Sequence, residues 1–313
     1  MLRIILRRIF LSIPLIIIVS AITFVLESLV PGDPARTLLG VAASPEQYEA
    51  LRQTLHLDQP IIVQYWLYLA NALHGDLGSS IFTDEPVAQL MAERLPVTLA
   101  VVVGGTAVAS AVGVLFGVFS ATRGRIARRV VDVVSVLGNA IPNFWLALVL
   151  AAVFAVGLGL FPATGFVPFE DSPAGWAQSL VLPVVALAIG GIALISKVTR
   201  DTMLSTLSLD FIRTLRASGI SERSIIWKHA LRHSGVTIVT VIGLTMLSFI
   251  PGSVFVENVF VLPGLGNAVV DATNQHDIPV VQGVALTFTV LVIIVNLLVD
   301  IAYGLLNPKV RSE

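Results

Sequence analysis

The sequence predicts an all-α integral membrane protein with six transmembrane helices. Of its 313 residues, 56% are hydrophobic and only 12% carry a charge, about half the charged fraction of an ordinary soluble domain. The mean hydropathy is +0.90. Six apolar runs reach the roughly 20 residues that a helix needs to cross a bilayer. They lie at about 9–30, 98–121, 131–160, 179–198, 236–256 and 283–306.

The first apolar run follows Arg3, Arg7 and Arg8 and could therefore be a signal peptide. It continues to Val30, which is longer than the hydrophobic region of an ordinary signal, and no A-x-A cleavage site follows it. The sequence therefore predicts an uncleaved first transmembrane helix.

Residues 31–94 are acidic and too long for a simple connection, so we expect a small subdomain there. Ser44-Pro45-Glu46-Gln47 has the form of a capping box with proline at the first helical position. This pattern predicts a short helix over about 45–56. A second helix is expected to start near Pro86 and to continue into the second apolar run.

The second apolar run carries small residues at intervals of four: Gly105, Ala109, Gly113 and Gly117. Such a strip lets another helix approach closely, either within the chain or from another subunit. The third run, 131–160, exceeds one crossing of a bilayer, and Pro142 predicts a kink within it.

The basic residues predict the orientation. Of the 19 Lys and Arg residues, all but Arg36, Arg52 and Arg94 fall on the side that holds both termini, the 122–130 loop and the 197–233 segment. Because cytoplasmic loops are enriched in Lys and Arg, we expect the N- and C-termini in the cytoplasm and 31–94 outside.

Enzymatic chemistry is not expected from this chain. Gly-Lys-Ser/Thr, which an ATP-binding P-loop requires, does not occur, and there are no cysteines. His229 and His233 have a spacing that could hold a metal, but no carboxylate or thiol completes a set of ligands. We therefore expect neither a metal nor a cofactor in this chain, and the net charge of −1 gives no indication of a nucleic-acid partner.

Polar groups at mid-membrane depth are neutral. They are Thr106, Ser110, Thr245, Ser248, Thr287 and Asn296. A proton or sodium relay would place charged groups there. The pattern favours a pathway lined by neutral polar side chains, for a solute that is not held tightly in the membrane.

The polar segment 210–235 lies between two apolar runs. Residues 210–218 are compatible with a helix, Gly219 permits a left-handed turn, and Ser221 can cap a second helix over about 222–233. Three interpretations compete: a loop lying on anionic lipid, a voltage- or lipid-sensing element, and a docking element for a cytoplasmic protein. The helix–glycine–helix order favours docking over the other two.

This segment resembles the cytoplasmic EAA-type loop of binding-protein-dependent ABC importer permeases, in the form found in the dipeptide, oligopeptide and nickel branch. That form reads approximately D-Y-V-R-T-A-R-A-K-G-L-S, followed by a helix ending H-A-L-R-N. Here the chain reads Asp210-Phe211-Ile212-Arg213-Thr214-Leu215-Arg216-Ala217-Ser218-Gly219-Ile220-Ser221 and then His229-Ala230-Leu231-Arg232-His233.

The resemblance extends along nearly the whole chain. It includes Pro31-Gly32-Asp33-Pro34, Gly75-Asp76-Leu77-Gly78-Ser79-Ser80, Ile141-Pro142-Asn143-Phe144-Trp145, Pro263-Gly264-Leu265-Gly266 and Asn307-Pro308-Lys309-Val310-Arg311. One departure is Val236-Thr237, where the family has Leu-Pro after the loop. This departure predicts a different junction between the loop and the fifth apolar run.

The resemblance implies a type I importer core over 94–306, with a cytoplasmic coupling loop at 199–234. Residues 1–30 would form the N-terminal tip and first helix, 31–94 an extracytoplasmic subdomain, and 307–313 a cytoplasmic tail. The chain would be a non-catalytic subunit of a cell-membrane importer for di- and oligopeptides, nickel or another small solute. A standalone channel or secondary carrier is the alternative from another class.

The resemblance also implies partners. These are a second permease subunit, two cytoplasmic ATPase subunits that bind ATP and Mg²⁺, an extracytoplasmic solute-binding protein, and membrane lipid. The residues implied to contact the ATPase are Asp210, Arg213, Arg216, Ala217, Gly219, Ile220, Ser221, Arg223, Ile226, Trp227 and Lys228. Those implied to contact the binding protein are Asp58, Asp76, Asn267 and Asp271.

Overall fold

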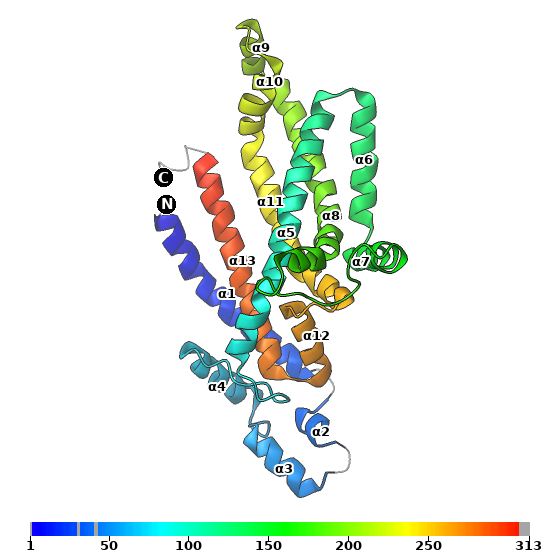
Figure 1. The fold of residues 1–313 in the computed structure, drawn as a ribbon. Coiled ribbons are helices and arrows are strands. Elements are labelled where there is room, and N and C mark those ends of the chain that lie inside the picture. Colours follow the sequence, from blue (N-terminus) through cyan, green and yellow to red (C-terminus); the bar gives the residue numbers. More distant parts are fainter. Residues whose placement is uncertain (1, 30–31, 41–42, 307–313) are drawn as a thin grey trace. The chain divides into compact units, whose positions relative to one another are not determined.

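The computed structural model describes residues 2–29, 32–40 and 43–306, and all regular elements in these ranges are helical (Figure 1). The tail 307–313 and Pro31 of the Pro31–Pro34 motif lie outside the described residues. The α-helices are α1 (Leu2–Leu29), α2 (Pro34–Leu39), α3 (Pro45–Thr54), α4 (Ile61–Leu73), α5 (Val87–Thr122), α6 (Arg125–Ala140), α7 (Asn143–Leu150), α8 (Pro173–Leu207), α9 (Asp210–Ala217), α10 (Glu222–Ser224), α11 (Leu231–Phe260), α12 (Leu265–Gln275) and α13 (Ile278–Leu306). Two π-helical turns are η1 (Ala151–Gly157) and η2 (Ile225–Ala230).

Within the described residues, five helices are long and apolar enough to cross a membrane. They are Phe10–Leu29, Val87–Thr122, Pro173–Leu207, Glu222–Phe260 and Ile278–Leu305. A bent pair, Arg128–Gly138 with Asn143–Gly157, adds a sixth span if its two parts are counted together. The all-α, six-span class predicted from the sequence is confirmed in this sense.

The expected kink at Pro142 is confirmed as a full break. The two parts of the third run meet at 96°. Pro142 crowds the backbone of the residue before it, which pushes that residue out of the helical region. Ile141 is accordingly extended, with φ −88° and ψ 121°, and α7 starts directly after the proline.

The chain divides into two compact units. One contains Leu99–Leu262 and the C-terminal part of α13 from Ile294, and the other contains Leu2–Thr98 and Pro263–Ile293.

The small-residue strip of α5 packs inside the first unit. A Cβ added at Gly113 would come within 2.9 Å of Ile195 on α8, and one at Gly117 would meet Thr199 and the carbonyl of Ser196. Ala109 is fully buried. Of the two roles left open by the sequence, the strip therefore serves close packing of α5 against α8.

Arg200 on α8 is 7% exposed and ties α8 to α6. Its guanidinium lies 2.6 Å from Asp132 of α6, donates two hydrogen bonds to Asp201, and donates a third to the carbonyl of Arg128. Both hydrogen bonds to Asp201 reach the same oxygen, Oδ1, and hydrogen bonds between two ionised groups are stronger than those between neutral groups. In the sequence Arg200 counts only as one of the cytoplasmic basic residues, and its partner Asp132 is remote in the chain.

The two helices predicted within 31–94 are both present in the second unit, as α3 and the start of α5. Ser44 accepts a hydrogen bond from the amide of Gln47, whose side chain accepts one from the amide of Ser44, so α3 starts with a capping box. α5 starts at Val87 and continues into the second apolar run. The sequence analysis missed α2 and α4.

The core of the second unit joins the start of α5 to α12 and the start of α13. Its buried residues are Val87, Leu90, Met91, Leu265, Ala268, Ala272, Val280, Val281 and Val284. Ser80 also donates a hydrogen bond of 2.5 Å to the carboxylate of Asp277, which fixes the 79–86 loop to the residue before α13.

Candidate functional site

The polar segment 210–230 forms two short helices around a glycine turn, as the sequence predicts. α9 ends with hydrogen bonds from the amide of Gly219 to the carbonyl of Arg216 and from the amide of Ile220 to the carbonyl of Leu215. Gly219 has φ +77°, a left-handed conformation that L-residues with a Cβ rarely adopt. The glycine therefore ends α9 and reverses the chain.

The second helix starts at a capped residue. Ser221 accepts a hydrogen bond from the amide of Ser224. Arg216 of α9 donates to Glu222 of α10 at 2.7 Å, and this hydrogen bond raises the pKa of Arg216. The pair spans the turn and holds the two helices together at its open side.

The second helix does not end at about 233, as the sequence analysis expected. It continues through η2 into α11, so that Glu222–Phe260 is one continuous helical run. Val236 and Thr237 lie inside α11, where the family's Leu-Pro would remove a backbone donor. Without that proline, nothing breaks the helix at this position.

An apolar cluster anchors the segment to the ends of α5 and α8. Ile212, Ile225 and Ala230 are fully buried, and they pack with Val118 and Ala121 of α5 and Met203 of α8. The hydroxyls of Thr206 on α8 and Ser234 on α11 lie 3.0 Å apart beside this cluster. α9 and the start of the second helix are therefore packed directly on the apolar spans, so a displacement of one would be transmitted to the other.

The opposite face of the segment is exposed and basic. Of the residues that the sequence analysis assigned to docking, Ile220 and Ile226 are partly buried against the apolar cluster. The others are exposed: Asp210, Arg213, Arg216, Ala217, Gly219, Ser221, Arg223, Trp227 and Lys228. Trp227 is 46% exposed, so the basic face also carries a large apolar side chain.

A hollow of about 300 Å³ lies beside this face, between α9 and the second helix. Its lining residues are Phe211, Lys228, His229, Arg232 and His233. The rings of Phe211 and His233 lie 5.3 Å apart, centre to centre. From the sequence, His229 and His233 were considered as a metal pair and interpreted instead as solvated residues of a basic helix, and this hollow was not predicted.

The four residues expected to meet a binding protein all lie in the second unit. Asp58 lies in the loop before α4 and Asp76 in the loop after it, where its carboxylate accepts a hydrogen bond from the amide of Gly78. Asn267 and Asp271 are one turn apart on α12. Asp58, Asp76 and Asp271 are exposed, whereas Asn267 is partly buried.

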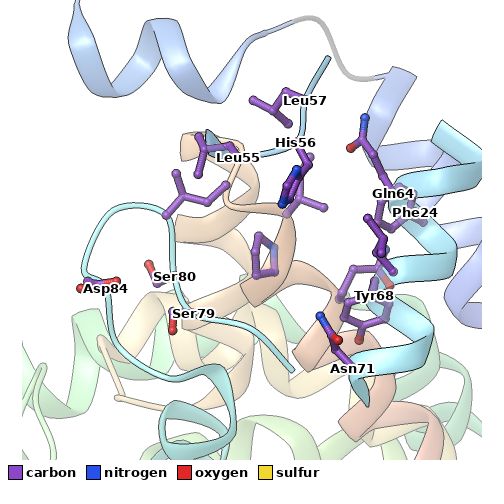
Figure 2. A pocket seen from close by; sticks show the side chains of 15 residues that line it. Phe24, Leu55, His56, Leu57, Gln64, Tyr68, Asn71, Ser79, Ser80 and Asp84 are labelled. Carbon is purple, nitrogen blue, oxygen red and sulfur yellow. The ribbon is translucent and has the colours of Figure 1, made fainter. Parts of the chain in front are cut away.

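The second unit also contains a cavity of about 380 Å³ that the sequence analysis did not predict (Figure 2). Tyr68 and Asn71 of α4 lie on one side of it, and Ser79, Ser80 and Asp84 of the following loop lie on the other. Gln282 of α13 completes the lining and is fully buried. A signal existed, because Gln64, Tyr68 and Asn71 recur at helical spacing and so share one face of α4.

A smaller cavity of about 130 Å³ lies among the spans of the first unit. Its polar lining is neutral: Asn143 of α7 with Thr245 and Ser248 of α11. Gly190 and Gly191 of α8 leave room beside them. Two of the mid-depth polar residues singled out in the sequence therefore lie together.

Apolar spans joined to an exposed, basic helix–glycine–helix segment define the permease class of membrane transport proteins. The chain belongs to the family of binding-protein-dependent transport system inner membrane components, whose model matches residues 113–312. The N-terminal model of the same group matches residues 1–102. The chain is thus a permease subunit of an ABC importer.

Similar proteins match the whole chain. A putative peptide transport system permease protein of Brucella abortus is 43% identical over 314 residues and covers 100% of both chains. A probable peptide ABC transporter permease of Sinorhizobium fredii is 37% identical and covers 98% of each. A glutathione transport system permease protein of Escherichia coli K12 is 37% identical over the full length of both.

The fold has a counterpart among solved structures. Inward-facing structures of the methionine ABC transporter MetNI cover 70% of this chain and 97% of the matched chain, with TM-scores of 0.54 and 0.56. The sequence identity is 18%, so this likeness concerns the fold alone.

Proposed function

We propose that the chain forms half of the translocation pathway of an ATP-driven importer for peptides. The observation that carries the proposal is the exposed, basic face of 210–228, which apolar packing holds against the ends of α5 and α8. A chain without a P-loop needs energy from another subunit, and this face is built to receive it. Peptides are the proposed cargo because two of the similar proteins are described as peptide permeases and one as a glutathione permease.

In this proposal the segment docks on a cytoplasmic ATPase, with one ATPase under each of two homologous permeases. Arg213, Arg223 and Lys228 supply charge complementarity, and Trp227 supplies apolar contact. Closure of the ATPases around ATP displaces α9 and η2, and the buried Ile212 and Ile225 transmit this displacement to the spans. Both termini lie in the cytoplasm, which agrees with the distribution of Lys and Arg.

In the same proposal, the extracytoplasmic loops and α12 receive the solute from outside the cell. Asp58, Asp76, Asn267 and Asp271 contact the solute-binding protein that delivers the peptide. Asn143, Thr245 and Ser248 line the path within the membrane. Their neutral side chains offer donors and acceptors that pair with peptide amides without the cost of burying a charge.

Transport assays on the reconstituted complex test the proposal. Proteoliposomes with both permeases, the ATPases and the binding protein should accumulate a labelled tripeptide only with ATP. Excess unlabelled peptide should compete, whereas Ni²⁺ should not. Uptake that persists when the P-loop lysine of the ATPase is changed to alanine would contradict the energy source. Competition by Ni²⁺ alone would contradict the cargo.

A further inference from the structure

Helix α4 has two chemically different faces. Ile62, Trp66 and Leu73 fall within about 40° of one another when each residue advances the helix by 100°. The opposite face carries polar side chains, Gln64, Tyr68 and Asn71. The polar face lines the 380 Å³ cavity, as Figure 2 shows for these three residues.

The apolar face is the one that points outward. Ile62 is 82% exposed, Trp66 68% and Leu73 80%. No Asp, Glu, Lys or Arg occurs anywhere in 61–73. A surface helix in water buries its apolar face and exposes its polar one, so α4 has the arrangement expected of a helix surrounded by hydrocarbon.

Contacts with α1 place α4 at membrane depth. The hydroxyl of Tyr65 lies 2.9 Å from the hydroxyl of Ser20 and donates to the carbonyl of Ile17 at 3.0 Å. The rings of Tyr65 and Phe24 are 5.6 Å apart, centre to centre. Ser20 lies near the middle of the apolar span Phe10–Leu29.

The length of α1 then limits where α4 can lie. Nine residues separate Ser20 from Leu29, which is about 13–14 Å of helix at 1.5 Å per residue. A tyrosine side chain is far shorter than this. The backbone of α4 at Tyr65 therefore lies within the length of the α1 span and not beyond its C-terminal end.

We propose that α4 is immersed in the bilayer leaflet at the C-terminal end of α1, with lipid acyl chains covering Ile62, Trp66 and Leu73. On α1, Ile22 and Leu26 are likewise 54% and 59% exposed. Under the proposed orientation the leaflet is the outer one. The polar face of α4 then seals the cavity behind it from lipid.

The chain has no cysteines, so single-cysteine variants can test this directly. Trp66→Cys carries a nitroxide label in the assembled transporter in lipid nanodiscs, and collisions with oxygen and with a water-soluble nickel chelate are measured. Leu26→Cys on α1 is the lipid reference, and Glu49→Cys on α3 is the aqueous reference. Ile62→Cys on the same face serves if Trp66→Cys does not fold.

The label at Trp66 should show the same ratio of oxygen collisions to nickel-chelate collisions as the label at Leu26. A ratio equal to that of Glu49 would place α4 in water and overturn the proposal. Protection from both reagents would show that a protein covers this face, which would also overturn it. This measurement needs neither ATP nor peptide. It can therefore contradict the position of α4 while the proposed function holds, and the proposed function can be wrong while α4 lies in lipid.

Discussion

Gly219 ends α9 and reverses the chain through its backbone conformation alone. A Cβ at this position would meet no atom within 4 Å, so a substitution here costs only backbone strain. An L-residue in a left-handed conformation costs about 1–2 kcal/mol, and asparagine costs less than a β-branched residue. The glycine is therefore required by the turn and not by crowding.

This strain makes Gly219 testable without disturbing the membrane region. Gly219→Val should lower ATP-driven uptake by up to roughly 5- to 30-fold, the factor that 1–2 kcal/mol represents. Gly219→Asn should retain most uptake. Gly124→Val, at a glycine with φ −67° and open surroundings, is the control. Equal uptake by the valine and asparagine variants at Gly219, with equal amounts in the membrane, would contradict this role.

Arg200 stabilises the packing of α6 on α8 through buried hydrogen bonds to charged groups. Such bonds contribute about 1.5–3 kcal/mol each, and both carboxylate partners are half-exposed, so the lower end applies. Arg200→Met should lower the Tm of the purified complex by several °C.

Arg129→Met is the matched control, because Arg129 lies on α6 with Asp132 but its side chain is exposed. It should leave the Tm almost unchanged. If both variants shift the Tm equally, burial of Arg200 is not the cause of its effect.

At the scale of elements, η2 sets the rotation of α10 relative to α11. The amide of Leu231 bonds to the carbonyl of Ile226, five residues back, so this turn holds one residue more than an α-helical turn. Both Ile225 and Ala230, at its two ends, are fully buried. The wide turn lets the two residues share the same apolar cluster.

Deleting His229 should convert η2 into a regular α-turn. Because a π turn with its extra residue and an α-turn without it cover nearly the same rotation, Ile225 and Ile212 should stay in their cluster. Deleting His229 and His233 together leaves no second extra residue to give up, so everything before them should rotate by about 100° relative to α11. We expect normal membrane insertion of both variants, with ATP-driven uptake kept by the single deletion and lost by the double one. Equal uptake by the two variants would refute this function of η2.

Elements with local signals were predictable from the sequence, and those with remote partners were not. The capping box at Ser44 and the turn at Gly219 depend on residues within one or two turns. α4 is packed through Tyr65 against Ser20, 45 residues away, and Arg200 pairs with Asp132 on another helix. The π turn has no compositional signature. The docking role of 210–228 stays a prediction from the family pattern, whereas the cavity of Figure 2 depends on tertiary contacts that the sequence does not reveal.

At the scale of the whole molecule, the proposed transport process requires more than one chain. The family models match residues 1–102 and 113–312, and similar proteins cover the full length, so the chain has the extent of its relatives. In the proposed function, it supplies spans and a docking face, while nucleotide chemistry belongs to a subunit with a P-loop. The central claim is therefore that the face at 210–228 meets that subunit.

Cross-linking tests this claim most directly. Trp227→Cys, or Arg223→Cys as a second position, carries a photoreactive maleimide in membranes that contain the complete transporter, and Asp58→Cys is the control. The account predicts that the labels at Trp227 and Arg223 form a covalent product with the ATPase subunit and that the label at Asp58 does not. An active transporter in which neither coupling position reaches the ATPase, or in which the label at Asp58 does, would contradict it.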